Sequence, residues 1–152
     1  MEFTCLRWTQ LPQIPLYMDQ VLLVLDQAFS PLAQADSPLV TSTMINNYVK
    51  MKLVAPPEKK KYSREHLARF VMICLMKKVL SMTEIAAVLD RVMADLTLEA
   101  CYDLFCRELE TRLRSLDGPD GTDCPAELAA AIRAVACKIT LEQMLGQDSA
   151  DS

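Results

Sequence analysis

Glycine and aromatic residues are scarce in this sequence. Glycine occurs 3 times in 152 residues, and Phe, Trp and Tyr together make up 6%. A β-sandwich or β-barrel needs many glycine-bearing turns and strands rich in aromatic and β-branched residues, so the composition disfavours both. Leu and Ala are abundant and methionine occurs nine times, which favours helices. The composition therefore predicts an all-α protein.

The sequence also lacks the residue groupings of most enzymes and metal sites. His66 is its one histidine, and it lies near the start of an expected helix between Arg64 and Arg69, where a surface residue is favoured over a general base. There is no glycine-rich phosphate loop and no nucleophile elbow. Cys101 and Cys106 are five residues apart, a spacing that does not place both thiols on one helical face. We expect no enzymatic activity, no metal and no cofactor.

No segment has the character of a membrane span or a secretion signal. No apolar run reaches the roughly 18 residues that a transmembrane helix needs. Glu2 stands where a signal peptide has basic residues, and Pro12 and Pro15 interrupt the first apolar stretch. The six cysteines form no compact framework, so we expect reduced thiols, a cytoplasmic location and no membrane partner.

Charge is distributed unevenly along the chain. The net charge is −4, but residues 44–78 carry nine basic and two acidic side chains, a local balance of +7. The rest of the chain has seven basic and eighteen acidic side chains, a balance of −11. Such asymmetry in a small acidic protein predicts one anion-binding patch.

Apolar spacing and helix-capping residues predict six helices. They are expected near residues 17–29, 43–51, 64–80, 83–94, 98–116 and 125–145. The helix over 64–80 is apolar nearly all round and should be central. In the helix over 98–116, acid-before-base pairs at i,i+4 spacing should stabilise the exposed side. These pairs are Asp103/Arg107, Glu108/Arg112 and Glu110/Arg114.

The chain divides into four expected segments. We expect an irregular arm over 1–16 docked through Trp8, a central domain over 17–95, a helical support or dimerisation segment over 96–146, and a disordered tail over 147–152 after Gly146. Residues 31–40 should be a loop or a weak helical turn. Two apolar stripes in the third segment could form a homodimer interface or could pack on each other within one chain. They are Leu98, Tyr102, Phe105 and Leu109, and Leu128, Ile132, Val135 and Ile139.

The short helix over 43–51 has one polar side. Thr43, Asn46, Asn47 and Lys50 follow i, i+3, i+4, i+7 spacing. Asparagine can bind an adenine edge with two hydrogen bonds, and lysine can meet guanine or phosphate, so this side suits a helix-turn-helix reader. Any solvated surface helix has such a side as well. The adjacent turn Lys59-Lys60-Lys61 could bind phosphates or only aid solubility.

The segment from Met44 to Pro57, MINNYVKMKLVAPP, resembles the recognition helix and following turn of MerR-type winged-helix regulators. The continuation KYSREHL over 61–67 and the SMTEI over 81–85 resemble later motifs of that group. The wording is closer still to a bacterial family, mostly from Firmicutes, described only as a domain of unknown function. The resemblance covers about residues 39–90.

The resemblance implies sequence-specific binding of double-stranded DNA. Asn46 falls on an arginine that reads or grips DNA, Asn47 on a tyrosine that contacts the backbone, and Lys60 near the basic residue of the wing. Lys52 stands at the position of a helix-ending glycine, and the wing is shorter than usual. The fold implied is a MerR-like winged helix-turn-helix with at most a small β-hairpin wing around 53–62, plus two C-terminal helices.

These observations together predict a DNA-binding transcriptional regulator, with a homodimer as the usual way for a short recognition helix to gain specificity. The alternative is a helical protein–protein adaptor that has kept the fold without reading DNA, which the net charge favours. The expected DNA-binding residues are Ser42, Thr43, Asn46, Asn47, Lys50, Lys59, Lys60, Lys61 and Arg64.

Overall fold

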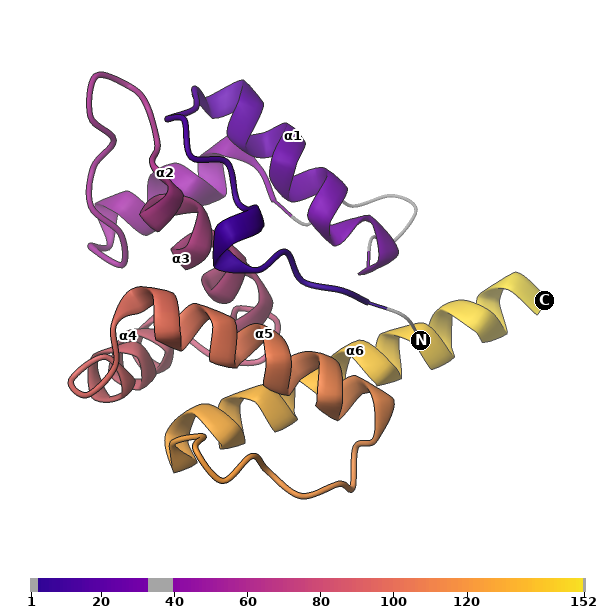
Figure 1. The fold of residues 1–152 in the computed structure, drawn as a ribbon. Coiled ribbons are helices and arrows are strands. Elements are labelled where there is room, and N and C mark those ends of the chain that lie inside the picture. The colour runs from indigo at the N-terminus through magenta and orange to yellow at the C-terminus, as the bar shows by residue number, and fades with distance from the viewer. Residues whose placement is uncertain (1–2, 33–39, 152) are drawn as a thin grey trace.

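The computed structural model describes residues 3–32 and 40–151, with side chains up to residue 146. Over these ranges the protein is all-α, as the sequence predicts (Figure 1). The helices are α1 (Met18–Phe29), α2 (Ser42–Lys50), α3 (Arg64–Met76), α4 (Met82–Val92), α5 (Leu98–Arg114) and α6 (Ala126–Asp151), with short 3-10 turns η1 (Trp8–Gln10) and η2 (Ser30–Leu32). The β-structure of the described residues consists of two isolated bridges, Leu16 with Tyr62 and Glu58 with Lys61.

Helix α3 is the centre of the core, as its all-round apolar sequence predicts. All seven residues from Phe70 to Met76 are buried, together with Leu67 and Ala68. The helix ends at Met76 rather than at Leu80, because the chain tightens into turns over 77–80 before it becomes extended at Ser81, the N-cap of α4.

Four helices begin at a hydroxyl that caps them. The side chains of Thr41, Ser63, Ser81 and Thr97 each accept a hydrogen bond from the backbone N–H three residues later. Such a cap satisfies one free N–H of the first turn and contributes about 1 kcal/mol. Thr41 therefore fixes the start of α2, next to the exposed residues Ser42 and Thr43 of that helix.

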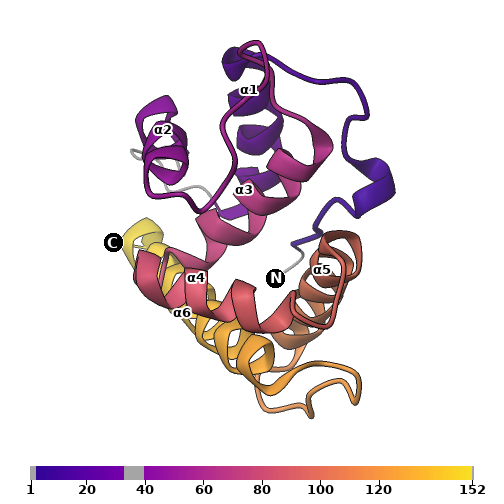
Figure 2. The ribbon, with the colours of Figure 1, turned by 90° about the vertical axis from the view of Figure 1, so that its left-hand side faces the viewer.

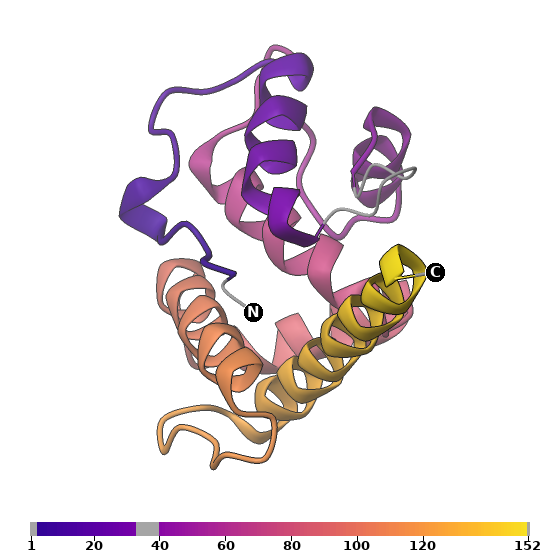
Figure 3. The same ribbon diagram turned by 90° about the vertical axis from the view of Figure 1, so that its right-hand side faces the viewer.

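Helices α5 and α6 pack against each other, and α3 contacts both (Figure 3). The two apolar stripes meet in this packing. Leu98 is partly buried against the core, and the other seven residues are at most 2% exposed: Tyr102, Phe105, Leu109, Leu128, Ile132, Val135 and Ile139. The stripes are thus used within one chain, which was one of the two outcomes that the sequence left open. They are not available to a second copy.

The N-terminal arm docks on α5, as expected. Trp8 donates its backbone N–H to Asp103 over 2.8 Å, and Arg7 forms an ion pair with Glu110 at 2.9 Å. The hydroxyl of Tyr102 donates to the Leu6 carbonyl over 2.5 Å. Two acids that were expected to pair along α5 therefore hold the arm instead.

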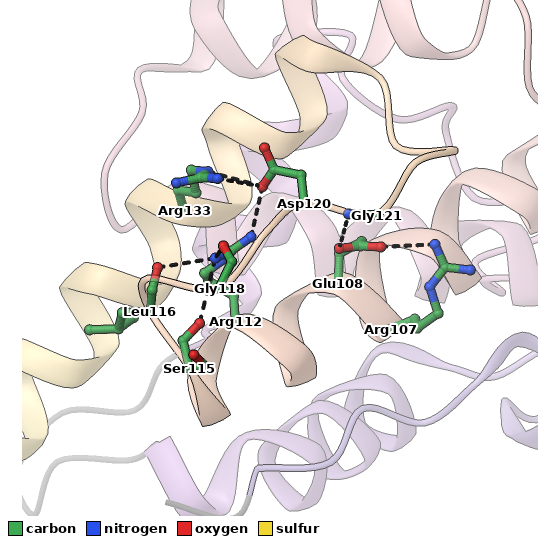
Figure 4. Close-up of polar contacts among 9 residues, drawn as sticks. All are labelled: Arg107, Glu108, Arg112, Ser115, Leu116, Gly118, Asp120, Gly121 and Arg133. Atoms are coloured by element: carbon green, nitrogen blue, oxygen red, sulfur yellow. Dashed lines mark hydrogen bonds and ion pairs between the residues drawn. The ribbon is translucent and has the colours of Figure 1, made fainter.

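The loop from α5 to α6 is likewise held by side chains of α5 that bind groups outside the helix (Figure 4). Arg112 is 3% exposed and donates to the carbonyls of Leu116 and Gly118 and to the carboxylate of Asp120, which also binds Arg133 of α6. Glu108 is 7% exposed and accepts from the N–H of Gly121. None of the three predicted i,i+4 pairs is present among the ion pairs of the described residues, because loop and arm groups offer these side chains better-placed partners.

The end of α6 differs from the sequence prediction. The helix continues through Asp151 rather than ending at Gly146, and in Figure 1 its C-terminal end extends beyond the other helices. A glycine inside a helix costs only about 1 kcal/mol relative to alanine, so it need not end a helix that is already long. Most of the expected loop over 31–40, residues 33–39, lies outside the described residues. None of the helices in the described part combines the length and apolar character that crossing a bilayer requires.

Candidate nucleic-acid interface

Helix α2 is oriented by its apolar side. Ile45 and Tyr48 are at most 1% exposed, and the Tyr48 hydroxyl lies 3.9 Å from the sulfur of Cys74 on α3. Burial raises the pKa of both the Tyr48 hydroxyl and the Cys74 thiol, so both groups stay neutral at physiological pH. With this side fixed against the core, the opposite side of α2 faces solvent.

The structure brings five expected site residues together on that exposed side. Ser42, Thr43, Asn46, Asn47 and Lys50 are all exposed, and all lie on α2. Figure 2 shows α2 at the outer edge of the molecule. A short exposed helix can enter the major groove of a DNA duplex, where its polar side chains can reach the base edges.

The end of α2 is a Schellman motif built on a lysine. Leu53 donates its N–H to the Tyr48 carbonyl and Lys52 donates to that of Val49, both over 3.0 Å. Lys52 has a φ of 62°, in the left-handed region where glycine is usual. The strained position therefore carries an exposed cation, which also complements the negative end of the helix dipole.

The lysine turn, residues 58–61, is a tight two-residue turn. Glu58 and Lys61 exchange backbone hydrogen bonds of 3.0 and 2.9 Å, and the residues between them, Lys59 and Lys60, have φ values of 52° and 65°. Both lysines are exposed. A left-handed conformation costs a residue other than glycine roughly 1–2 kcal/mol, so this backbone presents two cations at some cost in stability.

The turn is attached firmly to the body. Leu16 and Tyr62 exchange backbone hydrogen bonds of 2.9 and 2.8 Å, and the Lys61 ammonium lies 5.1 Å from the ring centre of Tyr17. His66 accepts the N–H of Ser63 at Nδ1 and lies with Nε2 3.0 Å from the Ala55 carbonyl, so it ties the loop to the start of α3. Figure 2 shows the loop from α2 to α3 rising beside α1.

Arg64 is placed differently from the other expected site residues. Its guanidinium donates to the Leu11 carbonyl over 3.1 Å and lies 5.9 Å from the ring centre of Trp8. These contacts commit the side chain to the N-terminal arm. Arg64 thus holds the arm near the start of α3 and does not join the exposed side of α2.

All but one of the positive charges of the basic segment, residues 44–78, lack an acidic partner within the described residues. The exception is Lys78, which forms an ion pair with Glu142 of α6 at 2.6 Å, and every other ion pair joins side chains outside the segment. Of the two acids in this segment, Glu65 has a lowered pKa because the Ser63 hydroxyl binds its carboxylate. Lys50, Lys52, Lys59 and Lys60 are exposed cations whose neutralisation by an external anion would release counterions.

Two further cations were missed as individual candidates by the sequence analysis. Lys52 and Arg69 lie in the same basic segment, but they border a groove between α2 and α4 rather than the polar side of α2. In the sequence, the signal that included these two cations was the excess of basic residues over 44–78. No group of three or more His, Cys, Asp or Glu in the described chain is arranged to hold a metal ion.

The fold and site define a class of small all-α protein that presents a capped helix and a lysine turn from one basic segment. The family model "Domain of unknown function (DUF1836)" matches residues 6–105, and the chain belongs to this family. The match begins in the N-terminal arm and ends within α5, so it includes α1 to α4 and the lysine turn. No curated protein and no solved structure matches the chain.

Proposed function

We propose that this protein binds double-stranded DNA as a transcriptional regulator, with α2 as the recognition helix of a MerR-like winged helix-turn-helix and the lysine turn as a short wing. One observation carries the proposal. The exposed side of α2 gathers Asn46, Asn47 and Lys50, and the same basic segment holds exposed lysines without an acidic partner among the described residues.

The two parts would contribute different interactions. Asn46 and Lys50 on α2 can meet base edges in the major groove, where asparagine selects adenine and lysine selects guanine. Lys59 and Lys60 can neutralise phosphates, which adds affinity without sequence preference. The hydroxyls of Ser42 and Thr43 at the start of α2 can donate to a phosphate there.

A homodimer belongs to the same proposal. Helix α2 has nine residues and reads few base pairs, so two copies on a palindromic site would raise specificity. Because the stripes of α5 and α6 are buried within one chain, the contact between copies would use another surface.

The proposal is tested by titrating a fluorescein-labelled random duplex with the full chain at several salt concentrations and following anisotropy. Affinity should fall with salt, with a slope in log–log form of about 0.9 per phosphate contacted. Replacing Lys59, Lys60 and Lys61 by alanine should weaken binding and reduce this slope. A control variant, with Arg91, Arg114 and Lys138 replaced by alanine, removes the same charge from outside residues 44–78 and should keep the parent slope.

The adaptor is the second candidate, and the balance of −11 outside residues 44–78 favours it, because that charge repels DNA. If the triple-lysine variant binds random and selected duplexes with the same affinity as the parent, the DNA-binding proposal is wrong. The adaptor function then takes its place.

A further inference from the structure

A groove separates the C-terminal end of α2 from α4. Its volume is about 660 Å³, and its walls are Val49, Lys50 and residues 52–56, Arg69 of α3, and Ala86, Leu89 and Asp90 of α4. Small-molecule sites usually have volumes of about 300–1,000 Å³, so the groove is large enough for one small ligand.

The lining divides into an apolar part and a charged part. Pro56 is exposed and Val49 and Ala86 are half-buried, so these side chains contribute apolar surface to the groove. The ionisable lining residues are Lys50, Lys52, Arg69 and Asp90, three cations and one carboxylate. None of these four forms an ion pair with another described residue.

This combination selects a particular ligand chemistry. The excess of two positive charges favours an anion, and a guanidinium with two ammonium groups can bind its acidic group by charge-assisted hydrogen bonds. The apolar surface gains free energy only if the ligand brings an apolar body to cover it. A DNA backbone has the phosphate but not such a body, so the groove fits a small organic anion better.

We propose that the groove between α2 and α4 is a binding site for an organic anion that carries one acidic group on an apolar ring or chain. Lys50 lies at the boundary between this groove and the exposed side of α2, and Lys52 forms the left-handed end of that helix. An anion held by these lysines neutralises charge beside the recognition helix and lowers affinity for DNA. This regulatory effect rests on the proposed function, whereas the ligand site does not.

The site is tested with the probe 8-anilinonaphthalene-1-sulfonate, which has one acidic group on an apolar aromatic body, added to the full folded chain. We expect saturable binding at a single site by calorimetry, with NMR shifts centred on the 49–56 segment and α4. Lys52→Gln and Arg69→Gln should each weaken binding about tenfold, the effect of losing one charge-assisted hydrogen bond. Asp90→Asn should tighten binding at the same single site, whereas a partly unfolded chain would bind this probe weakly at several sites.

The matched control is Lys77→Gln, which removes an exposed charge outside the groove and should bind the probe like the parent. Absence of saturable binding overturns the proposal. So does equal binding by the parent and the Lys52 and Arg69 variants, or an equal loss in the control.

The regulatory effect is tested by repeating the DNA titration with saturating probe. Parent affinity should fall several-fold, and Lys52→Gln should show a smaller change at the same probe concentration. Probe binding without any DNA binding would uphold the ligand site and reject the proposed function. DNA binding without probe binding would uphold the proposed function and reject the ligand site. If DNA and probe both bind and neither changes the affinity for the other, the regulatory effect is rejected.

Discussion

Glu58 and Lys61 each donate a backbone N–H to the other's carbonyl, so the two residues close a turn whose tip is Lys59-Lys60. Two consecutive positive φ values define the tip, as in a type I′ turn, where Asn-Gly is the preferred pair. Both positions hold lysine, although a positive φ is sterically unfavourable for this residue. Strain of this kind is often retained where a side chain has a function, which agrees with a role for these cations.

The first prediction concerns this turn. Replacing Lys59 by Asn and Lys60 by Gly should raise the free energy of unfolding by about 1–2 kcal/mol, because both new residues tolerate positive φ. The same change should weaken DNA binding, because two cations are lost. Urea denaturation and anisotropy measure the two effects. The control, alanine at both positions, removes the same charges but keeps the strain, so it should lose DNA affinity without gaining stability.

The second prediction is that alanine has opposite effects at two glycines. At Gly121 a new Cβ would clash with Oε1 of buried Glu108, so Gly121→Ala should displace that carboxylate and lower stability by about 1–3 kcal/mol. At Gly146 a Cβ meets nothing within 4 Å, and the residue lies inside α6. Gly146→Ala should therefore raise stability by up to about 1 kcal/mol. Equal shifts in midpoint for the two variants would contradict this account.

The third prediction concerns acid stability. The guanidinium of Arg133 lowers the pKa of Asp120, and that of Arg107 lowers the pKa of Asp123, below the ordinary value of 3.8. A carboxyl whose pKa is lower in the folded state stabilises the protein above the pKa of the unfolded chain, and this contribution is lost as pH falls through the folded value. The free energy of unfolding should thus decrease as pH falls below about 4.

Urea denaturation between pH 3 and pH 6, a range chosen to include ordinary carboxyl pKa values, measures this loss. With both Asp120 and Asp123 replaced by Asn, the acid-dependent loss should be smaller than in the parent. Asp95→Asn is the control, because Asp95 forms no ion pair within the described chain. A pH profile unchanged in the double variant would show that these pairs do not contribute.

The helices were predictable because apolar spacing reports which face is buried. Val21, Leu25 and Phe29 of α1 and Ile85, Leu89 and Val92 of α4 are buried as their spacing indicates. Helix ends were less predictable, since Gly146 lies within a helix and the chain leaves α3 at Met76. Both ends depend on the direction that the chain takes in three dimensions, and local sequence does not contain that information.

Charged partners were the least predictable feature. Arg112 is buried because carbonyls of the loop that follows α5 surround it, and Glu110 binds Arg7 of the N-terminal arm. Spacing along one helix cannot reveal partners of this kind. The exposed side of α2 could be predicted because Ile45 and Tyr48 define its opposite, whereas Arg64 could not, because its partner Leu11 lies in an aperiodic arm.

The last prediction separates base reading from phosphate binding. Asn46 is exposed in the middle of α2, so Asn46→Ala should leave the salt dependence of DNA binding unchanged and cost roughly 1–3 kcal/mol on the preferred sequence alone. The loss cannot come from unfolding, because alanine is the better helix former. The preferred duplex is selected from a random pool with the parent protein, and both proteins are then titrated against it and against a scrambled duplex. Gln27→Ala, an exposed polar truncation on α1, is the control and should bind both duplexes like the parent. A loss that is equal on the two duplexes would assign Asn46 to the phosphate backbone and remove α2 as the reader of sequence.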